Sequence, residues 1–178
     1  VLGLVAAIGF VVFLIWEYTD KHPVVDIRIF RHRGFSIATL TLAFGFAAFF
    51  GSIVIIPQWL QSNMGYNATW AGYLTAMMGF GSLTMSPIVA KLASKFDARL
   101  LASFGFVLMS GVTLLRAFWN NEADFMALAL PQIIQGFAVP FFFIPLSNLA
   151  LGSVLPQEIA SAAGLMNFVR TMAGALGT

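Results

Sequence analysis

The 178-residue chain is 60% hydrophobic and 9% charged, with a mean hydropathy of +0.90 and a formal net charge of +2. Soluble domains carry about 25% charged residues, so this composition predicts a membrane protein with several spans. The chain has no cysteine, which excludes disulfides, thiol catalysis and cysteine-ligated metals. No basic cluster with interleaved aromatic residues indicates nucleic-acid binding, so we expect no nucleic-acid partner.

The first apolar run, Val1–Trp16, would form a helix of about 24 Å, slightly short for a bilayer core of roughly 30 Å. We therefore expect residues 1–34 to hold the end of a transmembrane helix and a polar loop. This loop contains both histidines, His22 and His32, which we interpret as solvated residues. Both ends of the chain fall inside apolar runs, so we expect a piece of a longer protein.

Five apolar segments follow within residues 35–178, and each is long enough to cross a bilayer as a helix. They are Phe35–Leu60, Trp70–Ala90, Leu100–Trp119, Phe125–Leu155 and Ile159–Thr178. We predict an all-α membrane protein, a polytopic helical bundle with the last helix truncated.

The basic residues predict the orientation of this bundle. Seven of the nine Lys and Arg residues lie in two polar segments, Glu17–Gly34 and Lys91–Arg99. Two predicted spans separate these segments, so both lie on one side of the membrane. Basic loops face the cytoplasm in most membrane proteins, so we expect a multi-pass membrane protein with these loops inside.

The segment Phe125–Leu155 has no charged residue, yet it is not uniformly apolar. Pro140 and Pro145 each remove a backbone donor and disfavour a straight helix. Polar side chains also lie within it, and unpaired polar groups are costly at membrane depth. Such a helix either lines a path or binds neighbouring helices through its polar side chains, and both interpretations stay open. These polar residues are Gln132, Gln135, Ser147 and Asn148.

Arg170 is the charge that we place deepest, about 20 Å along the last span. It shares one face of that helix with Asn167, Thr171 and Gly174, at spacings of three and four residues. A charge at this depth costs several kcal/mol unless it is paired or hydrated. Arg170 therefore either locks two helices together or takes part in substrate or ion coupling.

The sequence carries no motif of a hydrolase, a metalloprotease or a nucleotide-binding enzyme. All seven acidic residues lie in loops or at helix ends, so no carboxylate is placed for proton relay within the spans. We expect no enzymatic activity and no bound cofactor or metal.

Two long runs carry a family resemblance. They are MGYNATWAGYLTAMMGFGSLTMSPIVAKLASKFDAR and PQIIQGFAVPFFFIPLSNLALGSVLPQEIASAAGLMNFVRTMAGALGT. They resemble the EmrB/QacA-type drug:proton antiporters, the fourteen-helix branch of the major facilitator superfamily. On this resemblance the chain matches most of the C-terminal six-helix domain, and Val1–Trp16 matches the end of the eighth helix.

The resemblance implies proton-driven efflux of hydrophobic or amphipathic compounds across the inner membrane, by alternating access of two domains. It implies a missing N-terminal half, which carries the coupling carboxylates, and for EmrB-like systems a periplasmic adaptor and an outer-membrane channel. The helix from Leu100 is expected to pack outside the central cavity, whereas the other four line it. The candidate path and coupling residues are Gln135, Phe142, Asn148, Asn167 and Arg170. The alternative is a non-transporting scaffold or sensor built on a transporter-like bundle.

Overall fold

The computed structural model describes residues 8–9, 11–12, 15–16, 27–119 and 124–178. The elements in chain order are η1 (Ile27–Arg31), α2 (Arg33–Asn63), α3 (Ala68–Ala93), α4 (Ala98–Arg116), α5 (Phe125–Gly152), η2 (Pro156–Glu158) and α6 (Ile159–Gly177). Five helices of this part of the chain have the length and composition to cross a membrane, and its described residues form no strand. The predicted all-α helical bundle is thus confirmed. The helix end expected at Val1–Trp16 and the loop with His22 fall largely outside the described residues.

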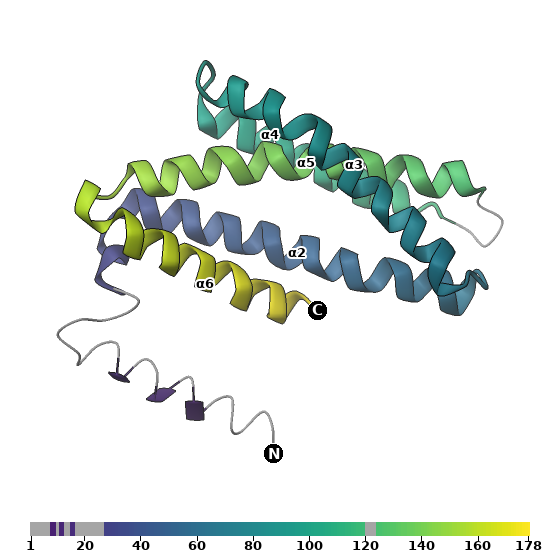
Figure 1. Cartoon of the computed structure of the whole chain (residues 1–178), viewed down its shortest axis with the longest axis horizontal. Helices are drawn as coiled ribbons and strands as arrows, with labels where there is room; N and C mark the ends of the chain where they lie inside the picture. Colours follow the sequence, from purple (N-terminus) through teal and green to yellow (C-terminus); the bar gives the residue numbers. More distant parts are fainter. Residues whose placement is uncertain (1–7, 10, 13–14, 17–26, 120–123) are drawn as a thin grey trace.

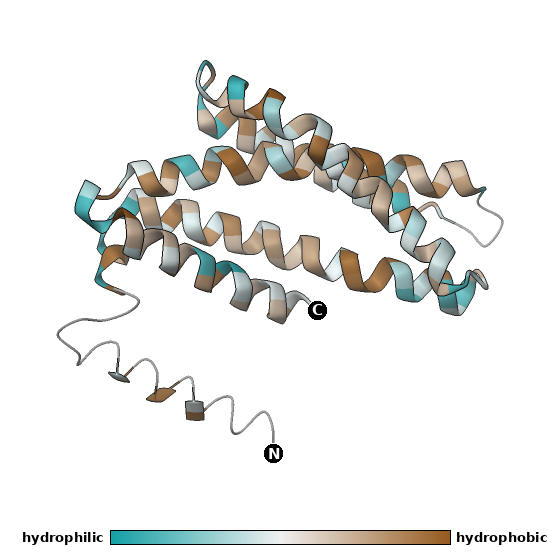
Figure 2. Ribbon diagram, in the orientation of Figure 1, coloured by the Kyte–Doolittle hydropathy of each residue, from teal (hydrophilic) through white to brown (hydrophobic). Residues whose placement is uncertain are grey.

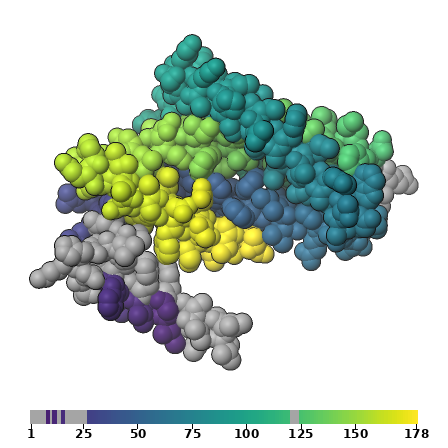
Figure 3. Space-filling view, viewed as in Figure 1, coloured from purple at the N-terminus to yellow at the C-terminus, as the bar shows by residue number. Residues whose placement is uncertain are grey.

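Helix α5 lies at the centre of the bundle (Figure 1). It packs extensively against α3 and α4 and also against α2, while α6 packs along α2. Figure 3 shows α6 and α3 on the same face of the molecule, each covering a different part of it. The central position of α5 agrees with its burial, because half of the residues in its most apolar 18-residue stretch are buried.

The two basic segments lie toward the same end of the bundle. The η1 segment with Arg28 and Arg31 and the α3–α4 turn both lie toward the left in Figure 1, and the α2–α3 turn lies at the right. This arrangement is the one that the charge pattern of the sequence requires, because α2 and α3 each cross the length of the bundle.

The sides of the bundle are largely apolar, as the brown residues along the helices show in Figure 2. Large hydrophobic side chains point outward, among them Phe44, Leu83 and Phe118, which is 84% exposed. An exposed apolar surface of this extent is not stable in water and fits contact with lipid or with further helices.

Side chains in the preceding turns cap the N-termini of three helices. The side-chain oxygens of Asn67, Asp97 and Asp124 accept from backbone N–H groups in the first turns of α3, α4 and α5. These groups have no acceptor within a helix, and side chains of this type are the usual caps. These turns therefore fix where α3, α4 and α5 start.

Helix α5 contains Pro131, Pro140 and Pro145, and the crossing of α3 and α5 compensates for Pro140. Pro140 has no N–H to give to the carbonyl of Gly136, one turn earlier. Ser82 Oγ of α3 donates to that same carbonyl at 2.9 Å, so the neighbouring helix supplies the missing hydrogen bond. The helices approach this closely because Gly81 and Gly136 face each other, and an added methyl on either would overlap the other helix's backbone.

A second contact joins the start of α2 to the turn between α5 and α6. His32 Nε2 lies 3.1 Å from Glu158 Oε2, and since a carboxylate only accepts, the imidazole donates from Nε2. The interpretation of His32 as a merely solvated loop residue is therefore wrong. The same carboxylate oxygen accepts from the backbone N–H of Leu155, so Glu158 links the turn between α5 and α6 to the start of α2.

Candidate functional site

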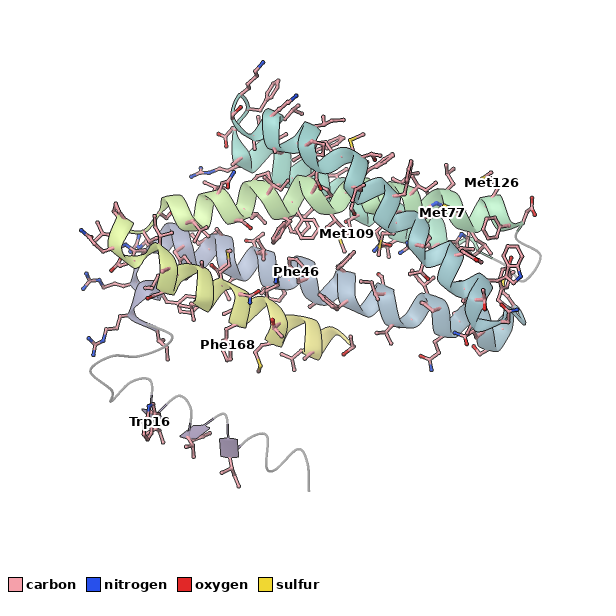
Figure 4. All side chains as sticks on the ribbon, viewed as in Figure 1. Trp16, Phe46, Met77, Met109, Met126 and Phe168 are labelled. Atoms are coloured by element: carbon pink, nitrogen blue, oxygen red, sulfur yellow. The ribbon has the colours of Figure 1, made fainter. Side chains whose placement is uncertain are left out.

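Arg170 of α6 lies against two aromatic rings from neighbouring helices. Its guanidinium carbon is 5.2 Å from the ring centre of Phe46 on α2 and 5.6 Å from that of Phe143 on α5. Phe46, labelled in Figure 4, stands where α2, α5 and α6 meet. The face of an aromatic ring attracts a cation, more strongly when water is excluded, so these rings stabilise the charge of a half-buried arginine.

The hydrogen-bond acceptor of Arg170 within the described residues is Asn167 Oδ1, one turn earlier on the same helix. The polar face predicted for α6 therefore exists, and Arg170 and Asn167 lie together on it. Within the described residues, α5 contributes the ring of Phe143 to the surroundings of Arg170.

A groove of about 530 Å³ opens beside Arg170. Its wall combines the aromatic residues of α2 with the polar and small residues of α6, including Thr171 and Gly174. A groove with one cation and mostly apolar walls suits ligands that are largely apolar, because few polar groups would need to be desolvated.

The other three predicted path residues lie elsewhere. Phe142 is fully buried in the core between the rings of Phe46 and Phe106. Asn148 is exposed near the far end of α5. Gln135 is buried at 1% exposure and is engaged by a residue of α4. The structure thus brings Asn167 and Arg170 together but does not join the five residues into one site.

Arg116 is the functional candidate that sequence reasoning missed. It is the last residue of α4 and donates from Nη2 to Gln132 Oε1 at 2.8 Å and to Gln135 Oε1 of α5. Its guanidinium carbon also lies 5.6 Å from the ring centre of Trp119. Arg170 is therefore not the only partly buried cation of the bundle.

The signal for this cluster was present in the sequence. Gln132 and Gln135 are three residues apart, which places both amides on one face of a helix. The arginine side chain has only hydrogen-bond donors, and the side-chain oxygens of two glutamines at this spacing can both accept from it. Arg116 lies near the end of its span, however, where a long cationic side chain can reach the membrane surface, so the sequence alone does not distinguish it from a surface residue.

Arg116 lines a second cavity, of about 520 Å³, between α2 and the end of α4. Trp59 and Trp119 close one side with rings stacked 5.6 Å apart. Thr113 and Arg116 of α4 face this cavity, and the expected place of α4 outside the central cavity stays a prediction.

Within the described residues, no group of three or more His, Asp or Glu side chains could hold a metal ion. Each of the two cavities is lined by one arginine, aromatic rings, hydroxyl-bearing side chains and small or apolar residues.

Comparison with known proteins identifies the family. The family model of the Major Facilitator Superfamily matches residues 1–178. The chain belongs to the Major Facilitator Superfamily. Among its relatives, the chain is similar to "Multidrug export protein EmrB" of Escherichia coli K12, with 41% identity over 179 residues that cover 100% of the chain and 35% of the relative.

Two further relatives of this superfamily have related names. "Probable multidrug resistance protein EmrY" of Escherichia coli K12 is 36% identical over 100% of the chain and 35% of its own length. "Fatty acid resistance protein FarB" of Neisseria gonorrhoeae is 32% identical over 99% of the chain and 35% of its own length. The chain thus spans about 35% of the length of these relatives, and it corresponds to the C-terminal part of EmrB. The predicted resemblance to EmrB/QacA-type transporters is confirmed, as is a multi-pass membrane protein.

Proposed function

We propose that these residues form the C-terminal portion of a proton-driven multidrug efflux transporter, which exports hydrophobic or amphipathic compounds across the inner membrane by alternating access. The names of the relatives, which are multidrug export and resistance proteins of one superfamily, support this proposal. They disfavour the alternative of a non-transporting scaffold or sensor, and they favour a transporter over an enzyme.

The observation that carries the proposal is the groove beside Arg170. A cation held by Phe46 and Phe143 lines a space whose other walls are mostly apolar. A purely structural helix clasp would not require an open space on one side of the charge. The groove gives an apolar compound a surface to contact and gives the protein a charge that can respond to substrate or proton.

The energy source in this proposal is the proton gradient, with no bound cofactor. The sequence places its seven acidic residues in loops or at helix ends, and Glu158 lies at the very start of the last span. In this proposal the carboxylates that carry protons belong to the N-terminal half of the transporter, as the resemblance implies. Arg170 would then respond to their charge at the interface of the two halves. A periplasmic adaptor and an outer-membrane channel complete the export path in this proposal.

The test uses the complete protein in which these residues occur, reconstituted into liposomes with a proton gradient. We expect the wild type to transport a hydrophobic dye only while the gradient exists. Arg170→Lys keeps the charge but loses the planar guanidinium, and Arg170→Ala loses both. If Arg170 takes part in coupling, both variants fold and both lose transport per folded molecule, counted by gel filtration in detergent.

The results that contradict the proposal are also specific. Absence of gradient-dependent transport by the folded wild type would refute the exporter. Wild-type transport per folded molecule by Arg170→Ala, together with a lower folded yield, would make Arg170 a helix clasp.

A further inference from the structure

We infer that a groove between α2, α4 and α5, at the basic end of the bundle, binds an anionic phospholipid, with Arg99 on the phosphate and apolar residues against the acyl chains. The groove has a volume of about 500 Å³, and its lining residues fall within 34–41 of α2, 99–106 of α4 and 146–153 at the end of α5. We call it the Arg99 groove. The inference goes beyond the proposed export, since it concerns a lipid that stays with the protein.

The groove runs along three helices from one end of the bundle. Helices α2 and α4 begin at this end and α5 ends there, toward the left in Figure 1. On each helix the lining covers eight positions, which is about 10 Å of helix. Both α2 and α4 pack against α5, so α5 forms the floor of the groove and the other two helices form its walls.

Arg99 places a cation at the end of the groove that lies nearest the membrane surface. Its side chain is exposed, and within the described residues no carboxylate lies within ion-pair distance of its guanidinium. Asp97, two residues earlier, caps α4 by accepting from the backbone N–H of Arg99 at 2.8 Å, and it does not line the groove. The guanidinium therefore has donors available for a phosphate, which can accept two of them at once.

Ser103 adds a second donor to the groove. It follows Arg99 by four residues, so both lie on one face of α4, and both line the groove. The hydroxyl of Ser103 makes no hydrogen bond within the part of the chain that the structure describes. The hydroxyls of Thr41 and Ser153 already donate to backbone carbonyls of their own helices. The side-chain donors of the groove are thus Arg99 and Ser103, and both suit an acceptor-rich anion.

The rest of the lining suits acyl chains. Phe106 and Leu146 lie at the deep end of the groove, about 10 Å along the helices from its mouth. Ile37 in the wall is 67% exposed, so the groove is open at its side and a long chain can pass from it into the bilayer. A charge at the surface with apolar residues below it matches the order of groups in a phospholipid. The other apolar lining residues are Ala38, Ala102 and Leu149.

The surroundings of the groove favour an anionic headgroup over a zwitterionic one. Within the described residues, this end of the bundle carries six Lys and Arg residues and two acidic residues. One of the two acidic residues, Glu158, is paired with His32. Basic residues at a membrane surface attract anionic lipids, and basic pockets between membrane helices bind their headgroups. The six are Arg28, Arg31, Arg33, Lys91, Lys95 and Arg99.

The rival explanation is that Arg99 is only solvated, as a basic loop residue usually is. Lys95 provides the comparison, because it is exposed in the same turn but does not line the groove. A solvated Arg99 would attract anionic lipids no more specifically than Lys95 does. The two residues therefore make a matched pair of sites for mutation.

The test measures lipid contact at the wall of the groove. The complete protein carrying Ile37→Cys is labelled there with a fluorophore and reconstituted into phosphatidylcholine vesicles, with the protein lacking this cysteine as labelling control. Nitroxide-labelled phosphatidylglycerol or nitroxide-labelled phosphatidylcholine with the same chains is then added as quencher. We expect phosphatidylglycerol to reach half-maximal quenching at a roughly fivefold lower mole fraction, as one arginine at the membrane surface implies.

Two results with this protein would overturn the inference. Equal quenching by the two lipids would show that the groove does not recognise the anionic headgroup. Quenching by neither lipid would show that another helix or another protein covers the groove. No proton gradient is applied, so the outcome does not depend on whether the protein exports anything.

Variants in the same labelled protein locate the headgroup. Arg99→Gln should lose the preference for phosphatidylglycerol, whereas Lys95→Gln, with the same change in net charge, should keep it. Wild-type preference in folded Arg99→Gln, or equal losses in both variants, would overturn the inference. Excess inorganic phosphate should leave the quenching unchanged because it has no acyl chains. Relief of the quenching by phosphate would make the groove a phosphate site and would overturn the lipid.

Discussion

The contact between Gly136 of α5 and Gly81 of α3 gives the sharpest test of the packing. A methyl group added at Gly136 would overlap the carbonyl oxygen of Met78 and would lie 3.1 Å from Gly81 Cα. Carbon atoms in ordinary contact are about 3.5–4.0 Å apart, so the two helices would have to separate by roughly 1 Å. We therefore expect Gly136→Ala to disrupt the α3–α5 crossing.

The magnitude follows from two contributions. Overfilling a packed interface destabilises by about 1–3 kcal/mol. The hydrogen bond from Ser82 Oγ to Gly136 O, at 2.9 Å, would lengthen beyond bonding distance, which adds about 1 kcal/mol. Together they predict that Gly136→Ala lowers the free energy of unfolding by about 2–4 kcal/mol.

The assay is thermal unfolding of the purified complete protein in detergent, with the folded fraction counted by gel filtration. The matched control is Gly79→Ala on α3, where an added methyl meets no atom within 4 Å. This control should stay within about 1 kcal/mol of wild type, the size of the intrinsic helix preference. Equal stability of Gly136→Ala and Gly79→Ala would refute the close crossing.

Three further predictions test other parts of the structure. Ser82→Ala removes the hydroxyl donor at the α3–α5 crossing and should lower stability by about 1–3 kcal/mol. Ser82→Thr, which keeps the hydroxyl, should lose less in the same unfolding assay. Phe143→Leu removes one aromatic face from Arg170 and should lower stability by about 0.5–2 kcal/mol; a loss as large in Phe143→Tyr would show that the ring face is not the cause. These 178 residues contain no cysteine, so single cysteines at exposed Ser62 and Ser94 report topology when the same protein without them is the background control. In intact cells, a membrane-impermeant maleimide should label Ser62→Cys and spare Ser94→Cys, and the reverse pattern would invert the orientation.

The class of the protein and its helices could be read directly from the sequence. Hydropathy adds up along a segment, so a long apolar run predicts a membrane helix whatever its neighbours are. The prediction for the last span, Ile159–Thr178, differs from α6 (Ile159–Gly177) by a single residue. The ends of the other helices differ more from the prediction; α5, for example, stops at Gly152 rather than Leu155, because the chain turns before Pro156.

The polar face of α6 was also predictable, because its residues are neighbours on one helix. Asn167 and Arg170 are three residues apart, and helix geometry alone brings them together. What the sequence could not predict is that Phe46 and Phe143 supply the other faces of the arginine, since they come from two different helices.

Only the tertiary structure decided which distant residues meet. Arg116 reaches Gln135 across 19 positions, Ser82 reaches Gly136 across 54, and His32 reaches Glu158 across 126. No periodicity within one segment carries this information, because it depends on which faces of two helices pack together and at what height. That choice is made by the summed packing of small residues such as Gly81 and Gly136, which let two backbones come close enough for a hydroxyl of one helix to bind a carbonyl of the other.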